Sequence, residues 1–173
     1  MKRSLITLSV VGLMLAGVAG AAVQKGDTEL NLAGSFTYTS LADDAGGGST
    51  TVFSLMIGAG YFVTDNIRLG VSTIDAWGGG ASAYIAGVDA KYHFMPTNQL
   101  VPYVGGQIAG SFIDPGGLGD TLTTYMYGPI AGARWELNEK NDFFVEYQFQ
   151  LFGGDTTFDN IHTVMFGIVH QFK

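Results

Sequence analysis

The sequence predicts an all-β chain, an eight-stranded antiparallel up-and-down β-barrel that follows an N-terminal signal peptide. Apolar and polar residues alternate with a period of two through most of the chain, which is the pattern of strands with two different faces. Short segments rich in Gly, Asn and Asp interrupt this alternation at the spacing of hairpins. The 173 residues include 26 Gly and no Cys, a composition that suits one domain without a disulfide framework.

The N-terminal segment has the three parts of a secretory signal. A positive pair, Lys2-Arg3, precedes the apolar stretch Leu5–Val18, and small residues follow as far as Ala21. The apolar stretch is shorter than the roughly 20 residues that a membrane-spanning helix needs. We therefore expect residues 1–21 to be removed and residues 22–173 to form the mature barrel domain.

The first half of the mature chain predicts four strands, each with an apolar and a polar face. The strand Thr28–Thr39 places Leu30 and Phe36 on one face and Glu29 and Asn31 on the other. The three strands that follow are predicted near Thr51–Phe62, from Ile67 onward and near Tyr84–Phe94, separated by a turn at Thr64–Asn66 and a loop at Trp77–Gly80.

The second half predicts four more strands, of which Phe143–Leu151 alternates most clearly. Pro129 lies within the sixth strand, and because proline cannot donate to the ladder we expect a bulge there. All eight strands have about the 9–11 residues of a tilted membrane strand, some slightly more. The other three are predicted near Leu100–Phe112, near Thr123–Leu137 and from Ile161, with connections at Met95–Gln99, Asp114–Gly117, Asn138–Asp142 and Gly153–Asp155.

The position of the charges indicates which face of the strands points outward and which lines the interior of the barrel. A soluble ligand carrier of the lipocalin kind would need a charged exterior, whereas the apolar face here carries essentially no charge. We therefore expect the apolar face to contact lipid and the charged residues to pair inside a narrow lumen. Arg134 is expected to pair with Glu146 or Glu136. The predicted lumen charge network is Glu29, Arg68, Asp89, Lys91, Arg134, Glu136 and Glu146.

Aromatic residues gather near the strand ends, as they do in the interfacial girdles of membrane barrels. Any one of them alone could be ordinary core filling, so the prediction depends on their collective placement. The girdle predicted at the periplasmic rim consists of Tyr61, Tyr92, Phe94, Trp135, Phe143 and Phe172.

Three segments carry a resemblance to a known family. Gly60–Ile67 resembles its strand-turn-strand pattern, Pro102–Gly106 resembles its fifth-strand entry, and Phe166–Phe172 resembles its C-terminal assembly signal. The mature chain thus resembles the small outer-membrane β-barrels that include the OmpA membrane domain, OmpX and OmpW-type proteins. The resemblance implies a cell outer membrane location, contact with outer-membrane lipids and lipopolysaccharide, and biogenesis with periplasmic chaperones and the barrel-assembly machinery. The residues of the implied assembly signal are Phe166, Ile168, His170 and Phe172, although Lys173 follows the terminal Phe and His170 stands where an aromatic is usual.

Several function classes are disfavoured. The formal net charge of -7 with only eight Lys and Arg argues against a nucleic-acid partner, which needs clustered basic residues. The three His residues have no neighbouring Ser that would indicate a catalytic pair, and the acidic loop residues lack the spacing of a calcium loop. We expect no catalytic residue, cofactor or metal.

The resulting hypothesis is a monomeric, non-enzymatic integral outer-membrane β-barrel that contributes to envelope structure or surface interaction, with a lumen largely plugged by charged and polar side chains. A narrow pore for small or hydrophobic solutes is the first alternative. A lipid-modifying outer-membrane enzyme is the second.

Overall fold

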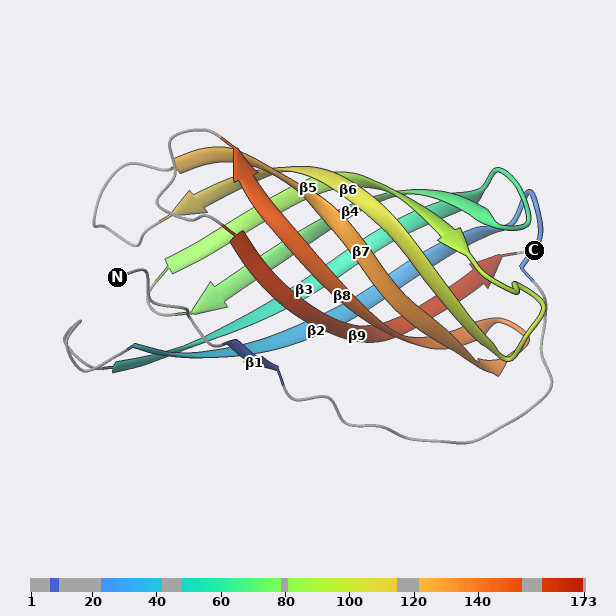
Figure 1. Ribbon diagram of the computed structural model, residues 1–173, viewed down its shortest axis with the longest axis horizontal. Coiled ribbons are helices and arrows are strands. Elements are labelled where there is room, and N and C mark those ends of the chain that lie inside the picture. The colour runs from blue at the N-terminus through green and yellow to red at the C-terminus, as the bar shows by residue number, and fades with distance from the viewer. Residues whose placement is uncertain are drawn as a thin grey trace.

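The computed structural model describes residues 7–9, 23–41, 48–78, 81–114, 122–153 and 160–172. These residues form strands joined by turns, and the strands wrap into a tilted barrel (Figure 1). The nine strands among the described residues are β1 Thr7–Ser9, β2 Thr28–Leu41, β3 Gly48–Phe62, β4 Ile67–Gly78, β5 Ala81–His93, β6 Leu100–Asp114, β7 Leu122–Asn138, β8 Asn141–Gly153 and β9 Asn160–Phe172.

Each strand from β2 to β8 pairs antiparallel with the next, and β9 also pairs antiparallel with β2. This last pairing closes eight strands into an up-and-down barrel and confirms the predicted fold class. The short strand β1 pairs with β2 at Thr37–Thr39, outside the eight-stranded ring. Apart from β1, the predicted signal peptide lies outside the described residues.

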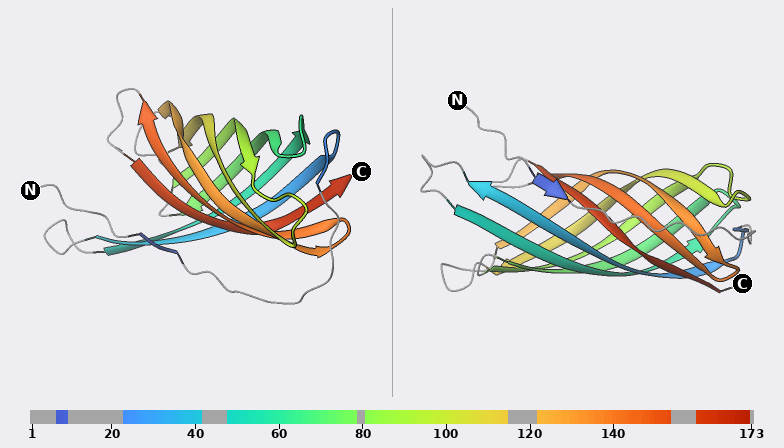
Figure 2. Two further views of the ribbon diagram at one scale, coloured as in Figure 1. Left: turned by 45° about the vertical axis from the view of Figure 1, so that its right-hand side comes forward. Right: turned by 90° about the horizontal axis from the view of Figure 1, so that it is seen from below.

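The closing seam between β2 and β9 is formed near the end of the barrel that holds the chain's C-terminus. Its register runs from Thr28↔Phe172 to Gly34↔Phe166. Beyond Gly34 the two strands diverge toward the other end, where β1 lies beside β2 (Figure 2). The barrel therefore has a tightly closed half, which we call the turn end, and a loop end at which β2 and β3 are joined by residues 42–47.

Short turns at the turn end follow from local side-chain hydrogen bonds. The Thr64 hydroxyl accepts hydrogen bonds from the backbone N–H groups of Asn66 and Ile67. The Asn138 side-chain oxygen does the same for Lys140 and Asn141. Such side chains satisfy the backbone where the ladder stops, which is why Ser, Thr, Asn and Asp mark turns.

Several strands extend into residues that were predicted to form turns or loops, and two of these differences affect charged residues. Strand β4 continues through Trp77 and Gly78, which were expected in a loop, and β8 begins at Asn141 rather than after Asp142. In both places the strand continues further toward the turn than predicted, so the connection between the two strands of the hairpin is shorter. The difference places Asp142 within a strand and so gives it a defined face, and it shows that Asp75 lies inside β4 rather than at its end.

The bulge expected at Pro129 was wrong. Tyr127 pairs with Leu151 and Ile130 with Gln148, so the register between β7 and β8 is the same on both sides of the proline. The ladder accommodates Pro129 by leaving it without a register partner on β8. An irregularity in this hairpin occurs instead between Glu136 and Asn138, beside the turn.

The interior is filled partly by apolar side chains. Buried apolar residues from β2, β3, β4, β8 and β9, two of them Met, pack together inside the barrel, with Ile85 of β5 against them. Met is well suited to such irregular space because its unbranched side chain adapts to its neighbours. This cluster consists of Ala33, Met56, Ile74, Phe144, Met165 and Val169.

Candidate functional site

The charged residues inside the barrel gather in its turn-end half. Arg68 is the second residue of β4 and Glu29 the second of β2, while Lys91 lies near the end of β5. The side chain of Arg68 is 1% exposed and that of Glu146 is 1% exposed. All seven residues predicted for the lumen network point inward from their strands, and all except the slightly more exposed Asp89 are classed as buried.

Two arginines share one carboxylate at the centre of this network. Arg68 forms ion pairs with Glu29 and Asp89. Arg134 donates from Nη1 to Glu29 Oε2 at 2.9 Å and from Nε to Asp142 Oδ2 at 2.6 Å. The planar guanidinium offers five donors in a fixed fork, so one arginine can hold two carboxylates at once.

Lys91 and Glu146 form the other centre of the network. The Lys91 ammonium pairs with Glu146 and lies 5.2 Å from the centre of the Tyr103 ring. Glu146 also accepts hydrogen bonds from the Tyr103 hydroxyl at 2.9 Å and from Gln148 Nε2 at 2.8 Å. The expectation that Arg134 pairs with Glu146 was therefore wrong, since Glu146 pairs with Lys91 and Arg134 pairs with Glu29 and Asp142.

Asp142 belongs to the network although the sequence analysis did not include it. It was placed in a turn, whereas it is the second residue of β8 and points inward. The signal that could have found it is its spacing from Glu146, because residues four apart in a strand share a face.

Glycines provide the space that the Arg68 guanidinium occupies. A Cβ atom added to Gly60 would lie 2.1 Å from Arg68 Nε, and one added to Gly70 would lie 2.4 Å from Arg68 Nη1. Real Cβ contacts are never this close, so these positions on β3 and β4 accept only glycine while Arg68 stays in place. The inward glycines are thus part of the charge network.

Aromatic rings close the network toward the turn end. Phe62 is fully buried and its ring lies 5.2 Å from His93, which lies 5.1 Å from Tyr103. The Arg134 guanidinium carbon lies 5.9 Å from the centre of the Phe62 ring, within the range of a cation–π contact.

Toward the loop end the lumen is lined by uncharged hydrogen-bonding groups. Gln148 Oε1 accepts hydrogen bonds from Gln107 at 3.3 Å and from Gln150 at 3.1 Å, and the hydroxyls of Ser35 and Ser54 are 2.6 Å apart. The cavity among the charged residues has a volume of only about 10 Å³, the room that one water molecule takes. The arrangement holds buried charges that pair with one another, with a cavity of about one water molecule between them.

The outer surface of the barrel is apolar. Large hydrophobic side chains point outward from every strand of the ring, and Ile108 is 64% exposed. The residues predicted for the periplasmic girdle lie at the turn end, where Tyr92 and Phe94 contact each other edge to face. Asp75 is an exception to the prediction of an uncharged outer face, since it is exposed on β4 and pairs in register with Tyr84 and Leu55. Near an interface such a charge costs little, unlike one at the bilayer midplane.

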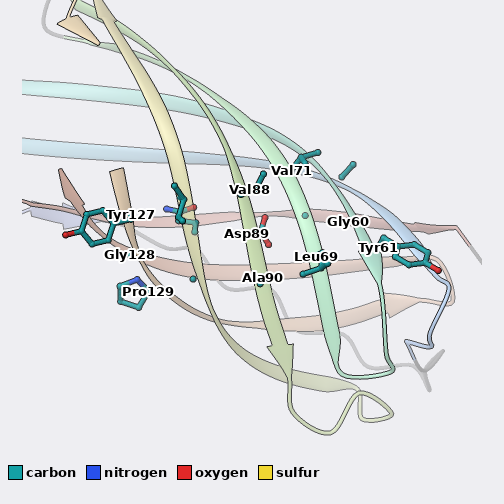
Figure 3. Close-up of a pocket in the computed structure, with 15 residues that line it drawn as sticks. Gly60, Tyr61, Leu69, Val71, Val88, Asp89, Ala90, Tyr127, Gly128 and Pro129 are labelled. Atoms are coloured by element: carbon teal, nitrogen blue, oxygen red, sulfur yellow. The ribbon is translucent and has the colours of Figure 1, made fainter. Parts of the chain in front are cut away.

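An open trough of about 1030 Å³ crosses the outer face over β3 to β7 (Figure 3). It follows one row of register partners around the barrel, and Tyr61 and Tyr127 stand at its opposite ends. Its floor is shallow because many of its residues are Gly or Ala, which carry little or no side chain. The residues of this row face the lumen, so only their backbone contributes to the trough. They are Gly60, Gly70, Asp89, Gln107 and Gly128.

The residues of the implied assembly signal share the outward face of β9. Phe166, Ile168 and Phe172 are exposed, and the His170 ring lies 4.7 Å from Phe172 while its Nδ1 is 2.9 Å from Asn141 Oδ1. His162 also points outward and is hydrogen bonded to the Tyr147 hydroxyl at 2.5 Å. The Nδ1 hydrogen bonds of these two histidines therefore go to Asn141 and Tyr147.

In the part of the chain that the structure describes, no helix is long and apolar enough to cross a membrane. Within the same residues, no group of three or more His, Cys, Asp and Glu side chains is arranged to hold a metal ion.

A closed ring of eight antiparallel strands with paired charges inside and apolar side chains outside defines a small transmembrane β-barrel. The solved structures similar to it are of this class. It resembles the N-terminal β-barrel domain of Pseudomonas aeruginosa OprF, with 20% identity over 86% of this chain and 99% of that chain and a TM-score of 0.61.

It also resembles Neisserial surface protein A (NspA), with 21% identity over 86% of this chain and 97% of that chain and a TM-score of 0.63. The outer membrane protein OprG from Pseudomonas aeruginosa is similar at 12% identity over 87% of this chain and 98% of that chain, with a TM-score of 0.53. No protein-family profile and no curated protein sequence matches the chain. The chain therefore has the fold of the small outer-membrane β-barrels, which confirms in fold the resemblance drawn from its sequence.

Proposed function

We propose that this protein is a non-enzymatic, monomeric integral outer-membrane β-barrel with a closed lumen, which contributes to envelope structure or surface interaction. The observation that carries the proposal is that charged side chains lie inside the barrel whereas large apolar side chains lie outside it. The charged side chains of the lumen network pair with one another inside, and large hydrophobic side chains are exposed outside on every strand of the ring. Such an exterior is stable only in hydrocarbon, and a closed barrel leaves no unpaired backbone there.

Export and assembly are part of the proposal. The signal-like residues 1–21 direct the chain across the inner membrane. The outward residues Phe166, Ile168, His170 and Phe172 of β9 then present the C-terminal signal to the barrel-assembly machinery. In the membrane, lipid and lipopolysaccharide acyl chains cover the outer face, including the trough between Tyr61 and Tyr127.

We expect the protein to fractionate with the outer membrane and to migrate differently on a detergent gel before and after heating, because a folded barrel resists detergent. The measurement is immunodetection of a tagged full-length chain after membrane separation. Recovery in the soluble periplasmic fraction would contradict the membrane assignment and favour a ligand carrier.

We expect the refolded protein to give no reproducible conductance steps in a planar lipid bilayer. The supporting observations are the packed apolar cluster around Met56 and Met165 and the cavity of about 10 Å³ among the charges, too small for a hydrated ion. Single-channel recording checks this, with a known porin as the positive control. Stable steps of one size would reject the closed lumen and favour the narrow pore.

A further inference from the structure

Three buried polar atoms at the turn end have no hydrogen-bond partner among the residues that the structure describes. They are Arg134 Nη2, Asp142 Oδ1 and Gln171 Oε1, each on a residue that is more than nine-tenths buried. All three residues line one cavity, which has a volume of about 10 Å³. Because buried polar groups are nearly always hydrogen bonded, one small polar molecule in this cavity would account for all three atoms.

The contacts of the three side chains fix the role of each atom. Gln171 Nε2 donates to Asp142 Oδ2 at 2.8 Å, so the other atom of this amide, Oε1, is an acceptor. Asp142 Oδ2 also accepts from Arg134 Nε at 2.6 Å, which leaves Oδ1 as the second acceptor of the carboxylate. Arg134 Nη2 lies 2.5 Å from Asp142 Oδ2 in an ion pair, yet it makes no hydrogen bond within the described residues. It therefore lies on the Asp142 side of the guanidinium and offers a donor to the cavity.

One donor and two acceptors match the hydrogen-bonding groups of a water molecule. A water can accept from Arg134 and donate to the other two side chains, and buried waters make about three hydrogen bonds. A metal cation cannot accept from the guanidinium and would lie against its positive charge, and an ammonium ion has donors only. An anion would face the Asp142 carboxylate. The volume of about 10 Å³ is also about what one water needs.

The cavity is covered by a buried apolar side chain. Val23 is 3% exposed and lines the cavity, and its backbone N–H lies 3.4 Å from the Pro96 oxygen. The segment that follows it is fixed to a neighbouring turn, because the Lys25 N–H donates to Asp65 Oδ1 at 2.8 Å. Val23 is thus held in the wall of the cavity, where it slows exchange of the contents with solvent.

We propose that this cavity binds one ordered water molecule, which accepts a hydrogen bond from Arg134 Nη2 and donates one each to Asp142 Oδ1 and Gln171 Oε1. The water joins β7, β8 and β9 at the turn end. A buried ion pair stabilises a protein only when its remaining donors and acceptors are also satisfied, so the water is part of what holds the charge network in place. The site lies inside the barrel and does not depend on the role of the protein in the envelope.

The test locates the water directly. The full-length chain is expressed, and the folded protein is extracted from the envelope in detergent and crystallised, at a resolution that shows ordered water. We expect a density peak in the cavity within hydrogen-bond distance of all three atoms. A second crystal is soaked in rubidium chloride, because rubidium scatters anomalously and water does not. We expect no anomalous peak at this position.

Matched variants test the assigned hydrogen bonds. Gln171→Met removes one acceptor and keeps the length of the side chain, so the occupancy of the peak should fall at least about twofold, since the water keeps two partners instead of three. Gln150→Met is the control, because Gln150 is similarly buried and donates to Gln148 Oε1 at 3.1 Å but is not among the residues that line this cavity. In solution, oxygen-17 relaxation dispersion counts long-lived buried waters. The wild type should exceed Gln171→Met by one such water and should equal Gln150→Met.

Each other outcome overturns the proposal at a distinct step. A cavity without density, with Arg134 Nη2 bonded directly to Asp142 Oδ1, would show that the side chains satisfy one another. An anomalous rubidium peak would assign the site to a monovalent cation. Equal occupancy in the wild type and Gln171→Met would remove Gln171 as a partner, and equal loss in both Met variants would assign the loss to general loosening. If Gln171→Met does not fold, the wild-type density and the rubidium soak still decide.

Discussion

Replacing Arg134 by Leu is expected to lower the free energy of unfolding by about 3–5 kcal/mol, the loss typical when one partner of a buried ion pair is removed. Arg134 is buried and holds both Glu29 and Asp142. Glu29 keeps Arg68, but Asp142 loses its cation and stays in the lumen. The measurement is urea unfolding in detergent micelles followed by tryptophan fluorescence. An unchanged midpoint would contradict the pairing.

A control and a rescue separate charge from packing. Lys140→Leu removes an exposed cation from the neighbouring turn and should change the free energy by no more than about 0.5 kcal/mol. Adding Asp142→Leu to Arg134→Leu should recover part of the loss, because replacing both charges by apolar groups leaves no stranded carboxylate. A double variant as unstable as the sum of the single variants would show that the two residues do not interact.

The faces of the strands could be predicted from the sequence, but the partners across the lumen could not. Period-two alternation fixes which residues point inward, so Glu29, Arg68 and Arg134 share the interior as expected. Glu29 and Arg134 lie on β2 and β7, which are not neighbours in the barrel, and they meet only because the ring closes through β9. A pair of this kind depends on the diameter of the barrel and on the register between its strands, and the local alternation of residues determines neither of them.

The boundaries of the hairpins limited the prediction in the same way. Asp142 was missed because it was assigned to the turn Asn138–Asp142, although the ladder extends through it. Asp75 lies before the predicted loop Trp77–Gly80 and was not given a face. The apolar cluster around Met56 and Met165 was also outside the expected picture of a polar lumen. Small barrels fill their interior with whatever side chains fit, so an inward face in the middle of the barrel need not be polar.

Gly60→Ala is expected to lower the free energy of unfolding by about 1–3 kcal/mol, the range for adding a methyl group to a packed interior. The new Cβ would lie 2.1 Å from Arg68 Nε and 2.5 Å from Arg68 Cζ. A free guanidinium could move aside, but this one is held by Glu29 and Asp89. The methyl group must therefore weaken at least one of these ion pairs. Urea unfolding midpoints at an unchanged m-value would measure the effect.

The control is Gly110→Ala, because a Cβ at Gly110 on β6 would meet nothing within 4 Å. A second measurement combines Gly60→Ala with Arg68→Lys, whose slimmer ammonium leaves room for the methyl group. This double variant should be less destabilised than the sum of its single variants, since the two residues compete for one space. Equal losses for Gly60→Ala and Gly110→Ala would mean that Arg68 moves freely, and the lumen charges would then be a mobile cluster rather than a fixed network.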